Sequence, residues 1–179
     1  KKANDICLEI LKEEPNNFNI LHLAGIIAFQ NKNYKISTAL FNKAIKINPN
    51  NADAHNNLAT ALKKLNRLDE AVTSWNHAII IRPDFIQAYN NRAYAMVELN
   101  RLDSAIEDYN KVIKIKPNLA EAYNNLGNVL NKINRFNDAI KNYDQAILIN
   151  PSYAEAYYNR GTVLQDLKSY EEAHDSYTR

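Results

Sequence analysis

Asparagine is the residue type whose spacing most clearly suggests chemistry in this sequence. It recurs every 34 residues in two adjacent columns, Asn56, Asn90 and Asn124, and Asn57, Asn91, Asn125 and Asn159. An Asn side chain carries a carbonyl acceptor and an amide donor, so a column can bond the backbone of an extended peptide whatever its side chains. The columns therefore predict peptide binding. The alternative is that an Asn-rich composition supplies them without any binding role.

Residue types used in catalysis and metal binding lack the spacing that such sites need. The four histidines do not form the short-spaced pairs of metal sites, and neither Cys7 nor a pair of carboxylates completes one: His22, His55, His77 and His174. The carboxylates of Asp69-Glu70 and Glu171-Glu172 open predicted helices, where the helix dipole favours negative charge. A glycine-rich phosphate loop is missing. We expect no catalytic residue, metal site or cofactor.

The overall composition excludes further classes of partner. The 22 basic and 20 acidic residues are mixed along all 179 positions and leave a net charge of +2. Nucleic acid and membrane surfaces are therefore disfavoured as partners. The most apolar stretch, residues 20–29, is half of the roughly 20 residues that a membrane span needs. The lone Cys7 fits a small buried side chain in a reducing, cytoplasmic compartment.

The prolines reveal the repeat period of the helices that must position the asparagine columns. They lie at intervals of 34 residues, at Pro15, Pro49, Pro83, Pro117 and Pro151. Such self-similarity is typical of units that cannot bury their apolar faces alone and stack into a continuous core. The sequence therefore predicts an all-α solenoid of antiparallel helical hairpins.

Two helices are predicted in each unit. The first helix carries a small residue at a fixed position, such as the glycine of Ala24-Gly25 or of Leu126-Gly127. This small residue lets two helices approach closely. The second carries an aromatic column that we expect to fill the gap between hairpins: Phe41, Trp75, Tyr109, Tyr143 and Tyr177. Between them, Asn66, Asn100 and Asn134 suit a left-handed helix end. After the prolines, Asn50 and Ser152 are predicted to cap the next helix.

These columns resemble the tetratricopeptide repeat signature of aromatic, Leu-Gly, large, Ala, aromatic and Pro residues: Tyr123, Leu126-Gly127, Leu130, Ala139, Tyr143 and Pro151. The resemblance divides the chain into a second helix of a partial repeat (1–17), full repeats (18–51, 52–85, 86–119 and 120–153) and a truncated repeat (154–179). His55, Arg92, Arg160 and Ser37 depart from the signature.

The resemblance implies a right-handed superhelix whose first helices line a concave groove. It places the two asparagine columns in that groove, with Tyr94 and Asn128 farther along the helices. Ile26 and Phe29 would make one end of the groove apolar, and such an exposed patch marks a contact unless a preceding helix covers it. We therefore expect protein or peptide ligands.

Two hypotheses for function remain open. The first is a non-catalytic adaptor or assembly scaffold that binds a peptide or partner helix in the groove. The second is a substrate-recognition arm of a larger glycosyltransferase, because the asparagine columns and residues 21–30 resemble the repeat arms of bacterial protein O-GlcNAc-transferase-like proteins.

The ends of the chain suggest a part of a longer protein. It opens on Lys1-Lys2 and stops at Arg179 inside a helical pattern. Because solenoids need capping units to cover their ends, we expect end-to-end self-association at high concentration.

Overall fold

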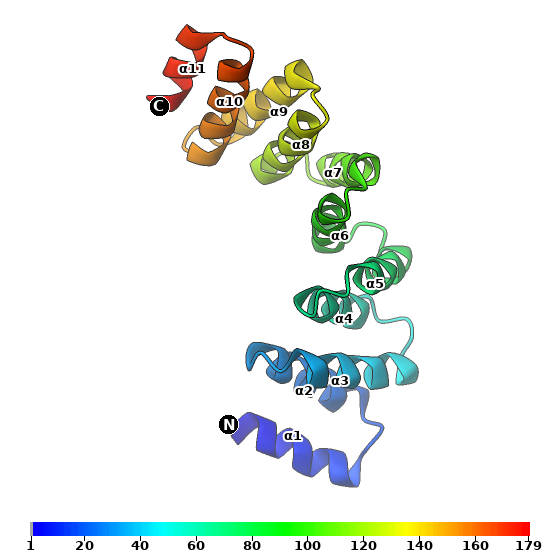
Figure 1. Cartoon of the computed structure of the whole chain (residues 1–179). Helices are drawn as coiled ribbons and strands as arrows, with labels where there is room; N and C mark the ends of the chain where they lie inside the picture. The colour runs from blue at the N-terminus through cyan, green and yellow to red at the C-terminus, as the bar shows by residue number, and fades with distance from the viewer. Residues whose placement is uncertain (1) are drawn as a thin grey trace. The chain divides into compact units, whose positions relative to one another are not determined.

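The computed structural model describes residues 2–179, with side chains for Cys7 and from Glu9 onward; Lys1 lies outside the described residues. Over this range the chain forms eleven helices and no strand. They are α1 (Lys2–Glu13), α2 (Phe18–Gln30), α3 (Tyr34–Ile47), α4 (Ala52–Lys64), α5 (Leu68–Ile81), α6 (Ile86–Glu98), α7 (Leu102–Ile115), α8 (Ala120–Lys132), α9 (Phe136–Ile149), α10 (Ala154–Asp166) and α11 (Tyr170–Tyr177). Figure 1 shows the helix pairs α2–α3, α4–α5, α8–α9 and α10–α11. The predicted all-α class is confirmed.

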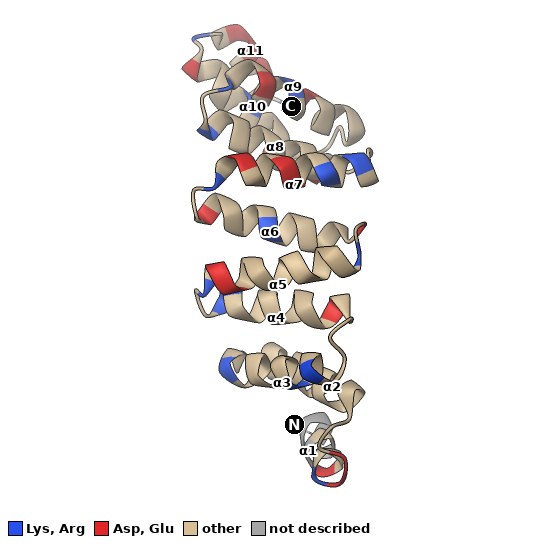
Figure 2. Ribbon diagram, turned by 90° about the vertical axis from the view of Figure 1, so that its right-hand side faces the viewer, with Lys and Arg blue, Asp and Glu red and all other residues tan. Residues whose placement is uncertain are grey.

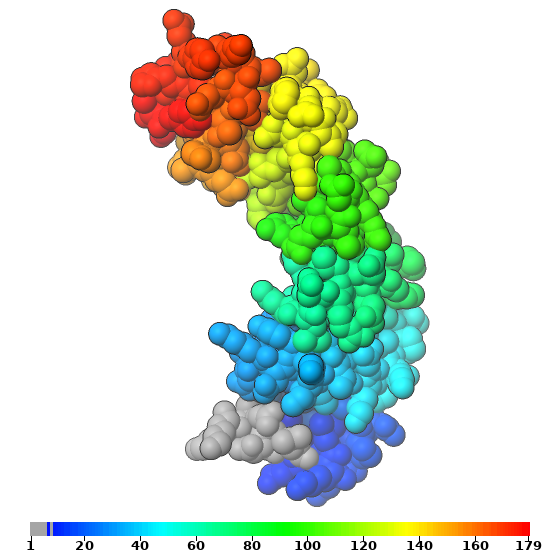
Figure 3. Space-filling model, viewed as in Figure 1, coloured from blue at the N-terminus to red at the C-terminus, as the bar shows by residue number. Residues whose placement is uncertain are grey.

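The chain divides into two compact units, residues 1–95 and 96–179, and the boundary in the sequence falls within α6. In the first unit α2 packs against α3 and α4 against α5, and α3 and α4 join the two hairpins. In the second unit α8 pairs with α9 and α10 with α11, joined through α9 and α10. Side chains fill the spaces between neighbouring helices of each unit (Figure 3). The predicted repeat boundaries stay a prediction.

The aromatic column forms the core between the helices as predicted, except that Tyr177, expected in the same column, is 44% exposed. Trp75, Tyr109 and Tyr143 are only 0%, 2% and 1% exposed. Each ring needs a small residue opposite it: a Cβ atom added to Gly127 would lie 2.6 Å from Cε1 of Tyr143. This contact is the physical reason for the small residue in the first helix of each hairpin.

The link between the two helices of a hairpin turns through a left-handed residue. Asn66, Asn100 and Asn134 have φ angles of 58°, 57° and 60°, which confirms their predicted role. Lys32 and Lys168 occupy the same conformation with φ angles of 61° and 62°. The amide after the left-handed residue bonds the carbonyl five residues earlier, as from Arg67 to Leu62 at 3.0 Å.

At Lys32 the Cβ atom is sterically unfavourable in this left-handed conformation, which costs free energy of folding. We expect Lys32→Gly to raise the free energy of unfolding by about 1 kcal/mol, because glycine adopts this conformation without that cost. Chemical denaturation measures the change. Lys43→Gly, on the exposed face of α3, is the control and should lower stability by about 1 kcal/mol. A loss at Lys32→Gly would contradict this account of the turn.

Helix capping differs from the prediction. Asn17 caps α2 by accepting from the Ile20 amide at 3.2 Å, and Asn51 caps α4 by accepting from the Ala54 amide at 2.8 Å. Asn50 is not the N-cap of α4, and Ser152 instead donates its hydroxyl to Asn150 at 2.9 Å. The prediction for Asn50 and Ser152 was wrong because the turn after each proline is longer than we assumed.

The residues that depart from the repeat signature each find a polar partner. His55 Nε2 lies 2.9 Å from the carbonyl of Pro49, the same contact that the Tyr89 hydroxyl makes with Pro83 at 3.4 Å. Ser37 donates its hydroxyl to the Gly25 carbonyl at 2.8 Å. The guanidinium groups behave likewise, since Arg92 donates to Asn76 at 2.6 Å and Arg160 to Asp144 at 2.6 Å. Polar bonds thus replace apolar packing at these positions.

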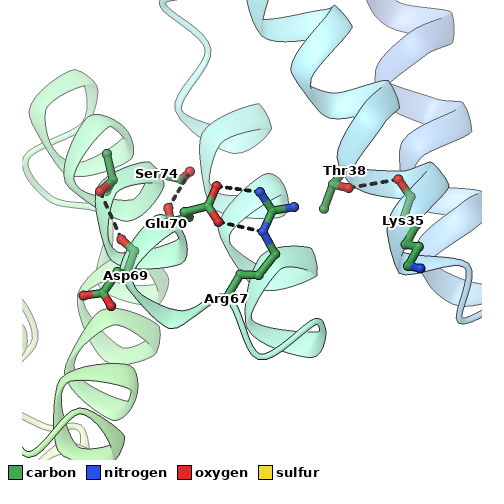
Figure 4. A network of polar contacts seen from close by, with 7 residues as sticks. Lys35, Thr38, Arg67, Asp69, Glu70 and Ser74 are labelled. Carbon is green, nitrogen blue, oxygen red and sulfur yellow. Dashed lines mark hydrogen bonds and ion pairs between the residues drawn. The ribbon is translucent and has the colours of Figure 1, made fainter.

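Basic and acidic residues are interspersed along the helices (Figure 2). Around the start of α5, the Arg67 guanidinium donates two hydrogen bonds of 2.6 Å to the Glu70 carboxylate (Figure 4). Nearby, the Ser74 hydroxyl donates to the backbone carbonyl of Glu70, and the Thr38 hydroxyl donates to that of Lys35. The Arg67 hydrogen bond lowers the pKa of the Glu70 carboxyl group, which makes it a weaker base. The exposed pair contributes little to stability.

Candidate binding site

A chain of hydrogen bonds runs across three helices of the first unit. The Trp75 indole N–H on α5 donates to Oδ1 of Asn56 at 3.2 Å. The Nδ2 group of Asn56 then donates to Oδ1 of Asn57 over a long 3.5 Å. On the far side, Nδ2 of Asn57 lies 3.0 Å from Nε2 of His22 on α2. Two of the predicted asparagines are therefore already bonded to groups of the protein.

Beside this chain lies a small, mainly apolar pocket of about 80 Å³. Its walls are Ile26 and Phe29 from α2, Phe41 from α3, and Asn57 and Thr60 from α4. The structure thus brings together Ile26, Phe29 and Asn57, three of the predicted site residues. Phe41 and Thr60 were not predicted for the site: we had placed Phe41 in the core, and Thr60 shares the 34-residue column of Tyr94 and Asn128.

Further polar and aromatic groups of the first unit lie on α4 and α6. The Thr60 hydroxyl donates to the Asn56 carbonyl at 2.9 Å, which leaves its oxygen lone pairs as acceptors. The ammonium group of Lys63 lies 3.9 Å from the ring centre of Tyr94, which is 57% exposed. Leu23 is 47% exposed on α2. This face of the first unit therefore combines apolar surface with groups that can bond a backbone.

His22 is held between two rings at the edge of this site. Its ring centre lies 5.7 Å from that of Phe18 and 5.6 Å from that of Phe41. Burial lowers the pKa of His22 below its ordinary value of 6.5, and the carboxylate of Asp53 opposes this shift. Asp53 is itself bound by Arg82, at 2.7 Å and 3.1 Å.

In the second unit the asparagines bond one another and their neighbours. Asn124 is fully buried, and its Nδ2 donates to Glu155 at 3.1 Å and to the Tyr153 hydroxyl at 3.4 Å. Its Oδ1 accepts from Asn159 at 3.0 Å. Because its amide offers no accessible surface, we remove Asn124 from the candidate binding residues. The Tyr143 hydroxyl donates to Asn128 at 2.8 Å, and Asn128 stays exposed.

One contact repeats in the two units. His22 meets Asn57, and Asn124 meets Asn159, in each case 35 residues along the chain. The first residue of each pair belongs to one 34-residue column, and the second belongs to the adjacent column in the next repeat, so the two are 34 plus 1 residues apart in the sequence. Asn90, Asn91 and Asn125 are half-buried.

A metal-binding cluster does not emerge from the described side chains, which are Cys7 and those from Glu9 onward. Among them, no group of three or more His, Cys, Asp or Glu could hold an ion. The rings of His55 and His77 lie near each other, with their centres 5.3 Å apart. None of the described helices combines the length and apolar character that crossing a membrane requires.

Family models match most of the chain. A model described as TPR repeat matches residues 59–100, 94–134 and 127–168, and models described as tetratricopeptide repeat match residues 18–51 and 40–73. The chain belongs to the tetratricopeptide repeat family. The resemblance seen in the sequence is thereby confirmed. A comparison with curated proteins found no match.

Solved structures of tetratricopeptide proteins share the fold. MamA is 21% identical, covers 86% of this chain and 90% of its own, and has a TM-score of 0.82. YrrB, described as a TPR protein with an unusual peptide-binding site, is 15% identical over 95% of this chain and 88% of its own, with a TM-score of 0.79. Pseudomonas aeruginosa PilF is 15% identical over 98% and 89%, with a TM-score of 0.77.

Proposed function

We propose that this tetratricopeptide chain is a non-catalytic interaction module that binds an extended peptide on the face formed by α2 and α4. One observation carries the proposal: the apolar pocket of Ile26, Phe29 and Phe41 lies directly beside the amide of Asn57 and the hydroxyl of Thr60. An extended peptide needs both features, a pocket for a side chain and polar groups for its backbone. The pocket anchors the peptide and the polar groups align it.

The size of the pocket indicates the anchoring side chain. About 80 Å³ is roughly half of the about 150 Å³ that holds a benzene ring in a dry engineered cavity. A branched aliphatic side chain fits this space better than an aromatic one. Asn57 and Thr60 are uncharged, and Asn57 retains one N–H beyond the bond to His22. The favoured ligand is an extended segment with a Leu, Ile or Val residue.

Selection from a displayed library of unstructured peptides tests this function. We expect enrichment of peptides with a single aliphatic anchor, and a loss of their binding by Phe29→Ala, which removes one wall of the pocket. Ile80→Ala is the matched control, because Ile80 is 75% exposed on α5 and does not line the pocket. Equal binding by both variants would overturn the proposed site.

The asparagine columns give a second prediction. Replacing Asn91 of the first unit by Ala should weaken a selected peptide by about 1 kcal/mol, the scale of one hydrogen bond. Folding should change little, and the melting temperature should stay equal or rise slightly, because Ala favours the helix more than Asn does. A binding titration with melting curves alongside measures both effects. Unchanged affinity would mean that Asn91 does not contact the peptide and would restrict the site to the pocket itself.

A further inference from the structure

The direction of the hydrogen-bond chain beside the pocket is fixed by its first member. The indole N–H of Trp75 can only donate, so Oδ1 of Asn56 must accept, and Nδ2 of Asn56 faces Asn57. Turning the Asn57 amide around would place two NH₂ groups 3.5 Å apart. Asn57 therefore presents Nδ2 to His22, and Nε2 of His22 must be an unprotonated acceptor.

Protonation of His22 breaks this arrangement. A charged imidazole carries N–H donors on both nitrogens, so Nε2–H would face the NH₂ group of Asn57 over 3.0 Å. The Asn57 amide cannot turn without opposing Asn56, whose orientation Trp75 fixes. The Asn57 side chain must then leave its position, and Asn57 is a wall of the pocket.

We propose that His22 acts as a proton-sensitive support for Asn57, so that the pocket binds its aliphatic anchor more tightly when His22 is neutral than when His22 is protonated. This inference rests on the proposed function of the pocket. It adds a regulatory role for a residue that does not line the pocket itself.

The surroundings of His22 set the pH range of this response. α3 presents the Phe41 ring and α2 the Phe18 ring, while Asp53 on α4 is the charged group that acts on His22 among the described residues. Burial outweighs Asp53 and lowers the pKa of His22 below 6.5. The site is therefore intact at neutral pH and is lost as the pH falls below 6.5 toward the lowered pKa.

Stability alone does not test this role. Burial also lowers the pKa of His55, which accordingly contributes stability that is present above pH 6.5 and is lost as the pH falls through the same range. The readouts must therefore be the side chain of Asn57 and the occupancy of the pocket.

The test uses nuclear magnetic resonance of the isotope-labelled chain between pH 5 and pH 8, with N-acetyl-leucinamide as the probe. We expect the Asn57 side-chain amide signals to shift with the same midpoint as the His22 ring. Affinity for the probe should fall at that midpoint by about 2- to 12-fold, the equivalent of one hydrogen bond.

Two variants separate the possible outcomes. His22→Gln keeps a neutral acceptor, so it should bind the probe equally at both ends of the pH range. His174→Gln, an exposed control on α11, should keep the pH dependence of the unchanged protein. The inference would be overturned if the unchanged protein bound the probe equally at every pH, or if the midpoint of the Asn57 signals differed from that of the His22 ring. Failure of the probe to bind at pH 8 would overturn the proposed function instead. In that case, comparison of the titration midpoints of Asn57 and His22 would still test whether His22 supports the Asn57 side chain.

Discussion

We expect Trp75→Ala to lower the free energy of unfolding by about 3–5 kcal/mol, the cost of removing a large buried aromatic side chain. Trp75 is 0% exposed and also donates its indole N–H to Asn56. The substitution removes both the ring and the donor that orients the asparagines. Chemical denaturation followed by circular dichroism measures the loss.

The Trp75→Phe variant separates the two contributions. It keeps a ring in the core and removes the hydrogen bond to Asn56, so it should cost less than Trp75→Ala. A loss below about 1 kcal/mol for Trp75→Ala would mean that the ring does not support the packing of the hairpins, contrary to its burial.

Asn124→Ala is the second substitution with a large expected effect. We expect a loss of about 1–3 kcal/mol in the free energy of unfolding. The change leaves the Asn159 amide without its acceptor and the Glu155 carboxylate without the donor that lies 3.1 Å away. Because Asn124 is fully buried, water does not replace these bonds freely.

Asn125→Ala provides the matched control for this measurement. It removes the same side chain from the next position of α8, where the asparagine is only half-buried. The two variants should differ clearly in thermal unfolding. Equal melting temperatures would show that the contacts of Asn124 do not stabilise the second unit.

The regular features of the fold could be predicted because each depends on local chemistry or on the period. The prolines mark the links between hairpins, the aromatic column predicts burial of Trp75 and Tyr143, and Asn66 predicts a left-handed turn. In each case one residue type satisfies one physical requirement, so the residue and its spacing suffice.

The bonds of the asparagines could not be predicted in the same way. The 34-residue period identifies the side chains that share a face, but it does not say which atoms of neighbouring hairpins meet. Asn57 and Asn124 share columns with partly exposed residues. However, the Asn57 amide already contacts His22, and the Asn124 amide is hydrogen-bonded to Glu155 and Asn159. An amide bonds another amide as readily as it bonds a peptide backbone, so chemistry alone does not separate the two roles.

The apolar part of the site was easier to predict than its polar part. Ile26 and Phe29 are apolar residues in mostly polar columns, and the structure places both at one pocket. Phe41 escaped the prediction because an aromatic column at the crossing of helices indicates core. Its ring serves the core and one wall of the pocket together.

The most direct test of the account is whether an aliphatic side chain enters the pocket of Ile26, Phe29 and Phe41. Titration of N-acetyl-leucinamide into methyl-labelled protein, followed by nuclear magnetic resonance, gives the answer, with N-acetylglycinamide as the probe that lacks a side chain. The account predicts saturable shifts of the Ile26 methyl signals with the leucine probe and much weaker shifts with the glycine probe, while Ile80 stays unchanged. Equal shifts with both probes, or shifts at Ile80 as large as those at Ile26, would contradict it.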